Sequence, residues 1–376
     1  MSHWPVDDRI FQGVKVLLND YVRTEQTDTF VIAYTPDSRE PAAWVALELK
    51  QRGFVPAIVA MNPMVDDTFA ARLASALPVP ADLPGQLVVI ALELDTMSHF
   101  EVFQTVMSRY GQDRCRTFRI ISASANLFSK AFNLTPEELS ALNATLLHRL
   151  QPARKLRVTS EGGTDIRVEI DSDRYQWISN RGKWRPGGYT MLPAGEIATY
   201  PVTVNGVLVA DGAFNANIIT SLDARLADHP IRVDIVDGEA VSMTCADPGV
   251  QKMLDLCLET PYGRHIGEFG LGTNAGIDEF IAYNSHINER RCGLHLGFGQ
   301  HNQSLSRVSY IADVHLDLIT RGALIQVDDC PQLIDLTRVV PTGVAHPTDA
   351  LDEDITTDCC GIGLGQLRSI ACPEPE

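Results

Sequence analysis

The chain has 376 residues, of which 45% are hydrophobic and 21% charged, and this balance excludes disorder as the default expectation. Its formal net charge of −17 argues against a nucleic acid or an anionic membrane surface as partner, because phosphate groups are bound by basic surfaces. We expect neither partner, and the length predicts two domains with sizeable cores.

Targeting signals and cysteine usage predict where the protein works. No stretch of the chain approaches the roughly 20 apolar residues of a transmembrane helix. The start, MSHWPVDDRI, lacks the apolar region of a signal peptide. The eight cysteines form no CxxC pair, which disfavours both a zinc ribbon and a disulfide framework. We therefore expect a protein of the reducing cytoplasm.

The first part of the chain alternates predicted helices and strands. Apolar periodicity predicts helices over residues 8–23 and over REPAAWVALELKQRG, which ends at Gly53. The apolar runs TFVIAYT, PAIVAM and LVVIALE predict buried strands. This alternation is typical of a doubly wound parallel sheet. The turn TPDSREP has no GxGxxG pattern after the first strand, so we expect no dinucleotide cofactor.

The pattern changes near residue 150 to short strands broken by Gly, Pro and Asp. The segments VNGV and DGEA predict hairpin turns, and residues 247–259 predict a helix. The expected fold class is α/β, with an N-terminal doubly wound parallel-sheet domain followed by an α+β, β-rich metal-binding domain. We place these domains at residues 1–150 and 151–345, with an acidic C-terminal extension at 346–376.

The segment VSYIADVHLDLI places His315 and Asp317 two residues apart in a predicted strand. Side chains at positions i and i+2 leave the same face of a strand, so these two can converge on one cation. Taken alone, the pair is more often a core histidine and an edge acid, because such dipeptides are common.

Three further donors lie upstream, each between glycines and apolar residues. His295 lies in CGLHLGFG, Glu268 in GEFGLGTN and Glu196 in LPAGEIATYP. Glycine inside a strand marks a close approach by a ligand or by another backbone. Ionised carboxylates are rarely buried without a partner, so a divalent cation is the simplest common partner for all five residues.

These strings, together with VTSEGGTDIRVEI, resemble the metal-binding pattern of the aminopeptidase T and aminopeptidase S type of leucyl aminopeptidases, which are dinuclear metallopeptidases. The resemblance covers roughly residues 154–341 and implies that Glu196, Glu268, His295, His315 and Asp317 are the metal ligands. The family has a tyrosine near the reacting carbonyl seven residues after its first ligand histidine, and here that position is Asn302. The interval between His295 and His315 is also shorter than in the peptidases.

The same region is similar to 2,5-dihydroxypyridine 5,6-dioxygenase, a mononuclear Fe(II) enzyme that cleaves a ring. In that enzyme a histidine stands at the position of Glu268. His295, His315 and Asp317 would then form a facial triad of two histidines and one carboxylate for iron.

We expect a metallohydrolase that resembles aminopeptidase T and cleaves an amide or peptide bond of a small molecule or short peptide. Two divalent ions (Zn, Co or Mn), bridged by Asp317 or a glutamate, would activate water, with Glu196 or Glu268 as general base. The alternative is an Fe(II) dioxygenase acting on a hydroxylated aromatic or heteroaromatic ring, and a third reading is a protein that binds metal without turnover. The resemblance also implies a homodimer.

Other residues near the predicted ligands have weaker claims to a function. His301 and Asn302 follow the strand of His295 and are candidates for contact with a ligand or with substrate. His265 and His286 are expected to be structural. Cys292 is also expected to be structural, because its odd spacing from His295 would send the two side chains to opposite faces of a strand.

Overall fold

The computed structural model describes residues 7–347 apart from 64, 94–98 and 219, so the acidic cluster of the predicted extension lies outside the described residues. The described chain forms two compact units. The first contains the chain up to Pro136 and Gly182–Ala194, and the second contains Glu137–Arg181 and the chain from Gly195 onward. The sequence predicts a single boundary between the two domains, near residue 150. In the structure, residues 137–150 cluster with the second unit, and residues 182–194 return to the first.

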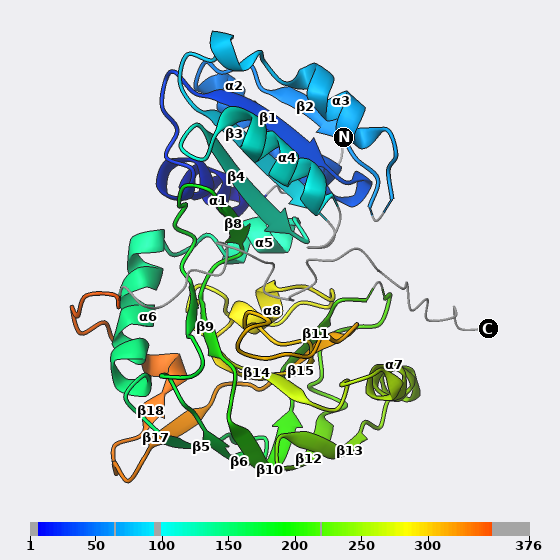
Figure 1. Ribbon diagram of the computed structural model, residues 1–376, viewed down its shortest axis with the longest axis vertical. Coiled ribbons are helices and arrows are strands. Elements are labelled where there is room, and N and C mark those ends of the chain that lie inside the picture. The colour runs from blue at the N-terminus through cyan, green and yellow to red at the C-terminus, as the bar shows by residue number, and fades with distance from the viewer. Residues whose placement is uncertain (1–6, 64, 94–98, 219, 348–376) are drawn as a thin grey trace. The chain divides into compact units, whose positions relative to one another are not determined.

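The first unit contains a five-stranded sheet with helices, in the order β2-β1-β3-β4-β8 and with parallel pairing throughout (Figure 1). Its strands are β1 (Thr29–Tyr34), β2 (Ala57–Ala60), β3 (Leu87–Glu93), β4 (Cys115–Ile121) and β8 (Tyr189–Leu192). Every residue of β3 and β4 is buried, as is typical of a parallel sheet that is covered on both faces.

The helices of this unit follow the predicted periodicity. They are α1 (Asp8–Val16), α2 (Arg39–Gln51), α3 (Phe69–Ala76), α4 (Phe100–Tyr110) and α5 (Ala125–Lys130), with a π-helical turn at Leu17–Tyr21 and 3₁₀ turns at Pro36–Ser38 and Pro80–Asp82. Asp7 caps α1 by accepting from the Arg9 backbone N–H, and Gly53 follows α2 with a φ of +90°. The predicted strands and helices of this region are confirmed.

The second unit is built from two antiparallel sheets. The seven-stranded sheet has the order β13-β12-β10-β6-β5-β17-β18, and the six-stranded sheet has the order β11-β16-β15-β14-β9-β7. The former contains β5 (Lys155–Thr159), β6 (Asp165–Glu169), β10 (Thr203–Ala210), β12 (Ile231–Val236), β13 (Glu239–Thr244), β17 (Leu324–Val327) and β18 (Ile334–Asp335). The latter contains β7 (Ile178–Asn180), β9 (Glu196–Thr199), β11 (Ala213–Ala216), β14 (Ile266–Gly272), β15 (Gly293–Gly299) and β16 (His315–Ile319). The helices are α6 (Pro136–Leu150), α7 (Pro248–Glu259) and α8 (Ile287–Arg290), with a 3₁₀ turn at Leu336–Arg338.

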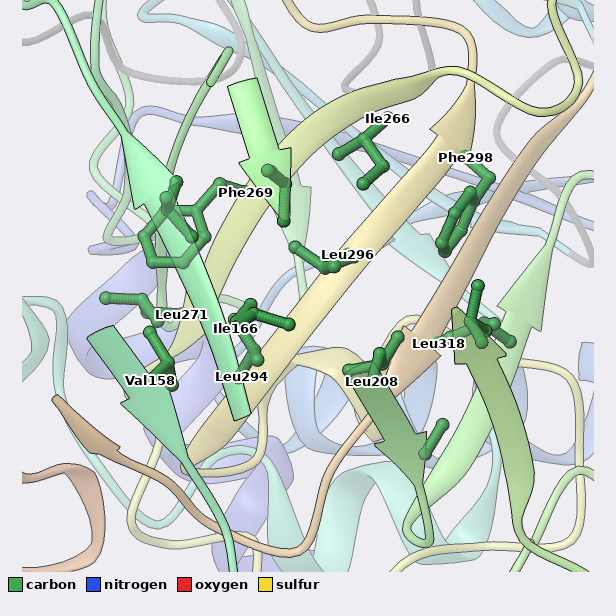
Figure 2. Close-up of a cluster of buried hydrophobic side chains, with 14 of the residues drawn as sticks. Val158, Ile166, Leu208, Ile266, Phe269, Leu271, Leu294, Leu296, Phe298 and Leu318 are labelled. Carbon is green, nitrogen blue, oxygen red and sulfur yellow. The ribbon is translucent and has the colours of Figure 1, made fainter. Parts of the chain in front are cut away.

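Apolar side chains of the two sheets meet in one core (Figure 2). Leu208 and Ile166 come from the seven-stranded sheet, and Phe269, Leu296 and Leu318 come from the six-stranded sheet; all five are fully buried. Because side chains alternate along a strand, this core fixes which residues of β14, β15 and β16 face the other way. The α/β fold class is confirmed, and none of the described helices has the length and apolar character needed to cross a membrane.

One of the two predicted hairpin turns is confirmed and the other is wrong. Asp237 and Gly238 join β12 to β13 with φ values of 49° and 81°, the backbone of a tight hairpin turn. The segment VNGV, by contrast, runs straight through β10. Gly206 allows close contact with β6 there, since a Cβ would lie within 3.0 Å of Asp165 and Ile166 backbone atoms. The helix predicted at 247–259 is α7, which Asp247 caps at the Val250 N–H.

Candidate metal centre

Four neighbouring strands of the six-stranded sheet carry all five predicted ligands. Glu196 begins β9, Glu268 lies in β14, His295 in β15, and His315 and Asp317 in β16. The apolar neighbours on these strands face the core, as the alternation predicts, so the donors share the opposite face. All five side chains are buried.

Each donor is paired with a glycine on a neighbouring strand. The cross-strand pairs are Glu196 with Gly272, Glu268 with Gly297, His295 with Gly270, His315 with Gly299, and Asp317 with Gly297. A Cβ at Gly270 would overlap the His295 ring. A Cβ at Gly297 would lie 2.9 Å from both Glu268 Cβ and His315 Cε1. The glycines therefore provide the space in which donors from different strands converge.

The donors form two groups that share Glu268. Glu196, Glu268 and His295 make one group, while Glu268, His315 and Asp317 make the other; within each, one ligand atom per residue lies within 4.8 Å of the others. His295 Nε2 lies 2.7 Å from Glu196 Oε1 and 3.3 Å from Glu268 Oε1. His315 Nε2 lies 3.1 Å from Asp317 Oδ1. The carboxylate of Glu268 therefore belongs to both donor groups.

A backbone contact orients His315 for metal binding. Its Nδ1 lies 2.8 Å from the carbonyl oxygen of Gln300. A carbonyl only accepts hydrogen bonds, so Nδ1 carries the proton, and Nε2 offers its lone pair toward Asp317. Metal-binding histidines are commonly held in this way.

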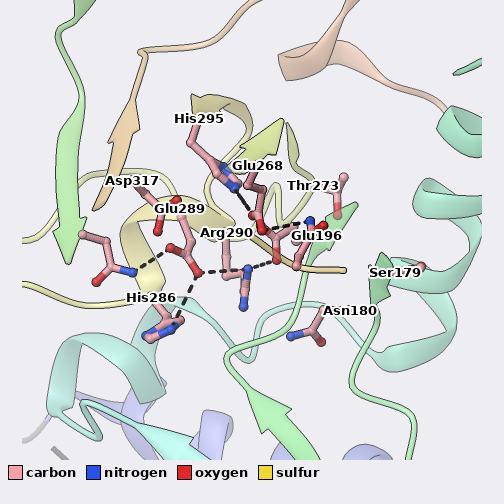
Figure 3. Close-up of polar contacts among 12 residues, drawn as sticks. Ser179, Asn180, Glu196, Glu268, Thr273, His286, Glu289, Arg290, His295 and Asp317 are labelled. Atoms are coloured by element: carbon pink, nitrogen blue, oxygen red, sulfur yellow. Dashed lines mark hydrogen bonds and ion pairs between the residues drawn. The ribbon is translucent and has the colours of Figure 1, made fainter. Parts of the chain in front are cut away.

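Helix α8 adds two charged residues that sequence analysis missed (Figure 3). The buried Arg290 guanidinium contacts Glu196 Oε2 and lies 3.0 Å from Glu289 Oε1. Asn215 Nδ2 donates to Glu289 Oε2 at 2.7 Å, and His286 Nε2 lies 3.9 Å from Glu289 Oε1. In the sequence, the available signal was a Glu-Arg pair five to six residues before His295. The structure buries both residues.

Burial and neighbouring charges perturb the carboxylates in opposite directions. Burial raises the pKa of Glu268 to about 7, and it also raises the pKa of Asp317. Burial opposes the ionisation of Glu196 as well, but Arg290 and His295 outweigh it and hold its pKa below the usual value. Glu289 is likewise held well below its usual pKa by His286 and Arg290, despite burial.

The remaining predicted residues fall into different surroundings. Asn302 Nδ2 donates to Glu268 Oε2 at 2.9 Å. His301 uses both ring nitrogens inside its own loop, donating from Nε2 to the Tyr310 carbonyl and accepting at Nδ1 from the Gln303 N–H. His265 Nε2 lies 3.2 Å from Glu239 Oε1, and neither residue is one of the donors. Burial raises the pKa of the Cys292 thiol to about 11, so a thiolate nucleophile there is not supported.

The donor set fits a divalent cation. Oε1 of Glu196 and Oδ1 of Asp317 are buried and have no hydrogen-bond partner among the described residues, although an imidazole nitrogen lies close to each. Imidazole nitrogens and carboxylate oxygens suit Zn, Mn, Co or Fe. The facial triad of His295, His315 and Asp317 is not among the converging groups that the described residues form. Glu268 stands with His315 and Asp317 instead.

Comparison with known proteins gives a family match and several solved structures of similar fold. The family model for NicX, 2,5-dihydroxypyridine 5,6-dioxygenase, matches residues 115–340, which include every donor. The structure of 2,5-dihydroxypyridine dioxygenase from Pseudomonas putida KT2440 aligns with a TM-score of 0.60 at 15% identity, over 90% of this chain and 99% of that chain. Wild-type AmpT from Thermus thermophilus aligns with a TM-score of 0.53 at 14% identity, over 87% and 97%. No curated protein sequence matches the chain.

Proposed function

We propose that this chain, which belongs to the 2,5-dihydroxypyridine 5,6-dioxygenase family, is a paired-metal hydrolase that cleaves an amide bond of a small substrate. The single observation that carries the proposal is the sharing of Glu268 between two groups of converging donors. A mononuclear centre needs only one such group. The family match and the donor groups together support an enzyme that depends on a divalent metal.

The charge of the site supports a divalent cation. Four buried carboxylates lie close together: those of Glu196, Glu268, Glu289 and Asp317. Among the described residues, one guanidinium, that of Arg290, contacts this set. Buried carboxylates without compensating charge are costly, and a divalent cation would compensate these carboxylates in place of protons on His295, His286 and Glu268.

The two glutamates have different surroundings and would therefore have different roles. Divalent ions held by these donors would polarise the substrate carbonyl and lower the pKa of a bound water. Arg290 keeps Glu196 ionised, as suits a permanent ligand. Glu268 would act as general base through an oxygen that is not bound to an ion, and its pKa, raised to about 7 in the metal-free protein, suits that role. It would take a proton from the attacking water as the carbon–oxygen bond forms, and return it to the leaving amine as the carbon–nitrogen bond breaks.

The second candidate is an Fe(II) oxygenase that opens a hydroxylated aromatic or heteroaromatic ring. The family match favours it, as does the position of Asn302 beside Glu268 in place of the peptidase tyrosine. On this reading, one ion would be held by Glu268, His315 and Asp317, a set with one histidine and two carboxylates. This reading leaves Glu196 and His295 without a role as ligands, which is why we place it second.

A direct comparison of the two chemistries tests the proposal. Chelator-treated protein is reloaded with Zn, Co or Mn and assayed for release of amine from aminoacyl amides. A second portion is reloaded with Fe(II) without oxygen and assayed for oxygen uptake with 2,5-dihydroxypyridine. We expect amide hydrolysis that is absent from a Glu268→Gln control. Oxygen uptake coupled to substrate loss, without amide hydrolysis, would establish the second candidate; metal binding without either activity would favour a non-catalytic protein.

We also propose that the protein is a cytoplasmic homodimer formed by its second unit. Exposed apolar side chains on adjacent strands of that unit, Val236 in β12 and Val241 in β13, offer a surface for association. Light scattering at micromolar concentration tests this. A mass near twice 41.3 kDa is expected, and a mass near 41.3 kDa would contradict it.

A further inference from the structure

A loop that follows β15 contacts two of the five donors. Gln300 accepts from His315 through its carbonyl oxygen, and Asn302 donates to Glu268 through its side-chain amide. The two donors lie on different strands, β16 and β14, so residues 300–303 link donors of two strands. We call these four residues the orienting loop.

We propose that Asn302 is a positioning residue for Glu268. The backbone of Gln176 orients the Asn302 side-chain amide, acting through the side chain of Gln303. The inference rests on the proposed paired-metal site and adds to it a role for the orienting loop. Asn302 would act on a ligand of the metal and not on the substrate. This distinguishes it from a substrate-binding residue at the same position.

The main chain of Gln176 fixes the direction of the hydrogen bonds. Its N–H donates to Gln303 Oε1 at 2.9 Å, and its carbonyl accepts from Gln303 Nε2 at 3.0 Å. A backbone N–H can only donate and a carbonyl can only accept, so the Gln303 amide has one possible orientation. The assignment of its oxygen and nitrogen therefore follows from the chemistry of the backbone.

The same logic then fixes Asn302. Gln303 Nε2 also donates to Asn302 Oδ1 at 2.7 Å, so the oxygen of the Asn302 amide must face Gln303. Its Nδ2 is left to face Glu268 Oε2, to which it donates at 2.9 Å. Glu268 is held in this way on one oxygen, while its Oε1 faces His295 Nε2 at 3.3 Å.

Gln303 follows β15, but its side chain is bonded to a residue near β7, at the edge of the six-stranded sheet. Gln176 lies two residues before the first residue of the short edge strand β7, and two strands, β14 and β9, separate β7 from β15. The rest of the loop is fixed as well, because His301 bonds to Tyr310 and Gln303, and Gln300 Oε1 accepts from the Ala312 N–H. Asn302 therefore has few ways to move without breaking the contact to Glu268.

The test measures metal binding directly, so it does not depend on finding the substrate. Apo-protein is titrated with Co(II) and followed by visible absorption, which reports both affinity and coordination. The variants are Asn302→Ala, which removes the donor, and Gln303→Glu, which keeps the acceptor for the Gln176 N–H but cannot donate to Asn302. Asn205→Asp is the matched control, because Asn205 is a partly exposed asparagine that bonds to Thr203 and Asp237 in the seven-stranded sheet. Thermal unfolding of each apo-variant verifies that it is folded.

We expect Asn302→Ala to weaken Co(II) binding by about 10- to 100-fold, the usual effect of removing a group that orients a metal ligand. Gln303→Glu should also weaken Co(II) binding, although Gln303 does not touch Glu268. Asn205→Asp should leave Co(II) binding unchanged. In a hydrolysis assay at saturating metal, Asn302→Ala should lower kcat and leave KM unchanged. Gln303→Leu, which removes the donor without adding charge, should reproduce the effect of Gln303→Glu.

Unchanged Co(II) affinity in Asn302→Ala, or a raised KM with unchanged affinity and kcat, would overturn the inference. Wild-type affinity in both Gln303 variants would overturn the relay from Gln176. Wild-type protein that binds Co(II) but hydrolyses no amide would overturn the proposed function alone, because the affinities of the variants would still be measured. Wild-type protein that binds no Co(II) would overturn both.

Discussion

The same strands form both faces of the six-stranded sheet, but the two faces have opposite effects on stability. One face carries Leu294, Leu296 and Leu318 into the core (Figure 2), and the other carries His295 and Asp317 into the donor groups (Figure 3). Burying the first face stabilises the fold through the hydrophobic effect. Burying carboxylates on the second face costs free energy unless they are compensated. The apolar face thus makes it possible to keep a crowded polar face in place.

The largest effect should follow from changing the polar face at its shared ligand. Glu268→Gln keeps the size of the side chain but removes the charge that both donor groups use. We expect activity to fall more than about 100-fold, beyond the usual effect of an outer-shell change. The apo-protein should stay folded, because a buried carboxylate among like charges is lost. Activity with bound metal is measured against wild type; retained activity would place the chemistry elsewhere, and His315→Ala should give the same loss.

A change on the apolar face should act on stability first. Leu296 is fully buried in the core of the second unit. Leu296→Ala should lower the free energy of unfolding by about 2–5 kcal/mol, through lost burial and the cavity left behind. Urea unfolding of apo-protein measures this. If the folded variant also lost all affinity for metal, the apolar face would contribute to metal binding as well as to stability, which would contradict the comparison.

The polar face should also make apo-stability depend on pH. The pKa of Glu268 is raised from 4.5 to about 7 in the folded protein, so between these values the folded state holds a proton that the unfolded state has lost. Stability contributed by this group is therefore present below pH 4.5 and lost as the pH rises through about 7. Relative to Glu268→Gln, the free energy of unfolding of the wild type should fall by roughly 3 kcal/mol as the pH rises over this range. Chemical unfolding of chelated protein at several pH values measures it, and the opposite slope would contradict the assignment.

The smallest effect should come from the glycines that separate the donors. Gly297→Ala would bring a Cβ to 2.9 Å from Glu268 Cβ and His315 Cε1, so the donors must move apart. We expect metal affinity to fall by about 10- to 100-fold, on the scale of other changes that misplace a ligand. Gly249→Ala in α7 is the control, because its new Cβ would lie 3.0 Å from a flexible Leu222 methyl group and 3.2 Å from Asp247 Oδ1, and neither residue is a donor. Equal affinity in the two variants would show that the glycines do not set the spacing.

Strand periodicity made the polar face predictable. The His-x-Asp spacing placed His315 and Asp317 on one face, and the glycines around Glu268 and His295 indicated close approach between strands; all five predicted donors do converge. The failure at VNGV has a related cause, because a glycine that allows backbone contact inside a strand has the same local sequence as one in a turn. Local pattern alone cannot separate these two uses.

The residues around the donors were harder to predict because they depend on tertiary contacts. Arg290 and Glu289 lie in a helix of four residues, which has too few positions for a periodic signal. The link from Gln176 to Gln303 joins residues 127 positions apart, and nothing local marks it. The return of residues 182–194 to the first unit as β8 is likewise a long-range pairing, of Tyr189 with Thr117 on β4.

The most direct test of the central claim is the number of metal ions that one chain binds. Chelator-treated protein is dialysed against excess Zn(II) or Mn(II), freed of unbound metal and analysed by mass spectrometry of the elements, with Glu268→Gln and His315→Ala treated alongside. The paired site predicts two ions per chain in wild type and fewer in both variants. One ion or none per wild-type chain, with all five donors intact, would contradict it.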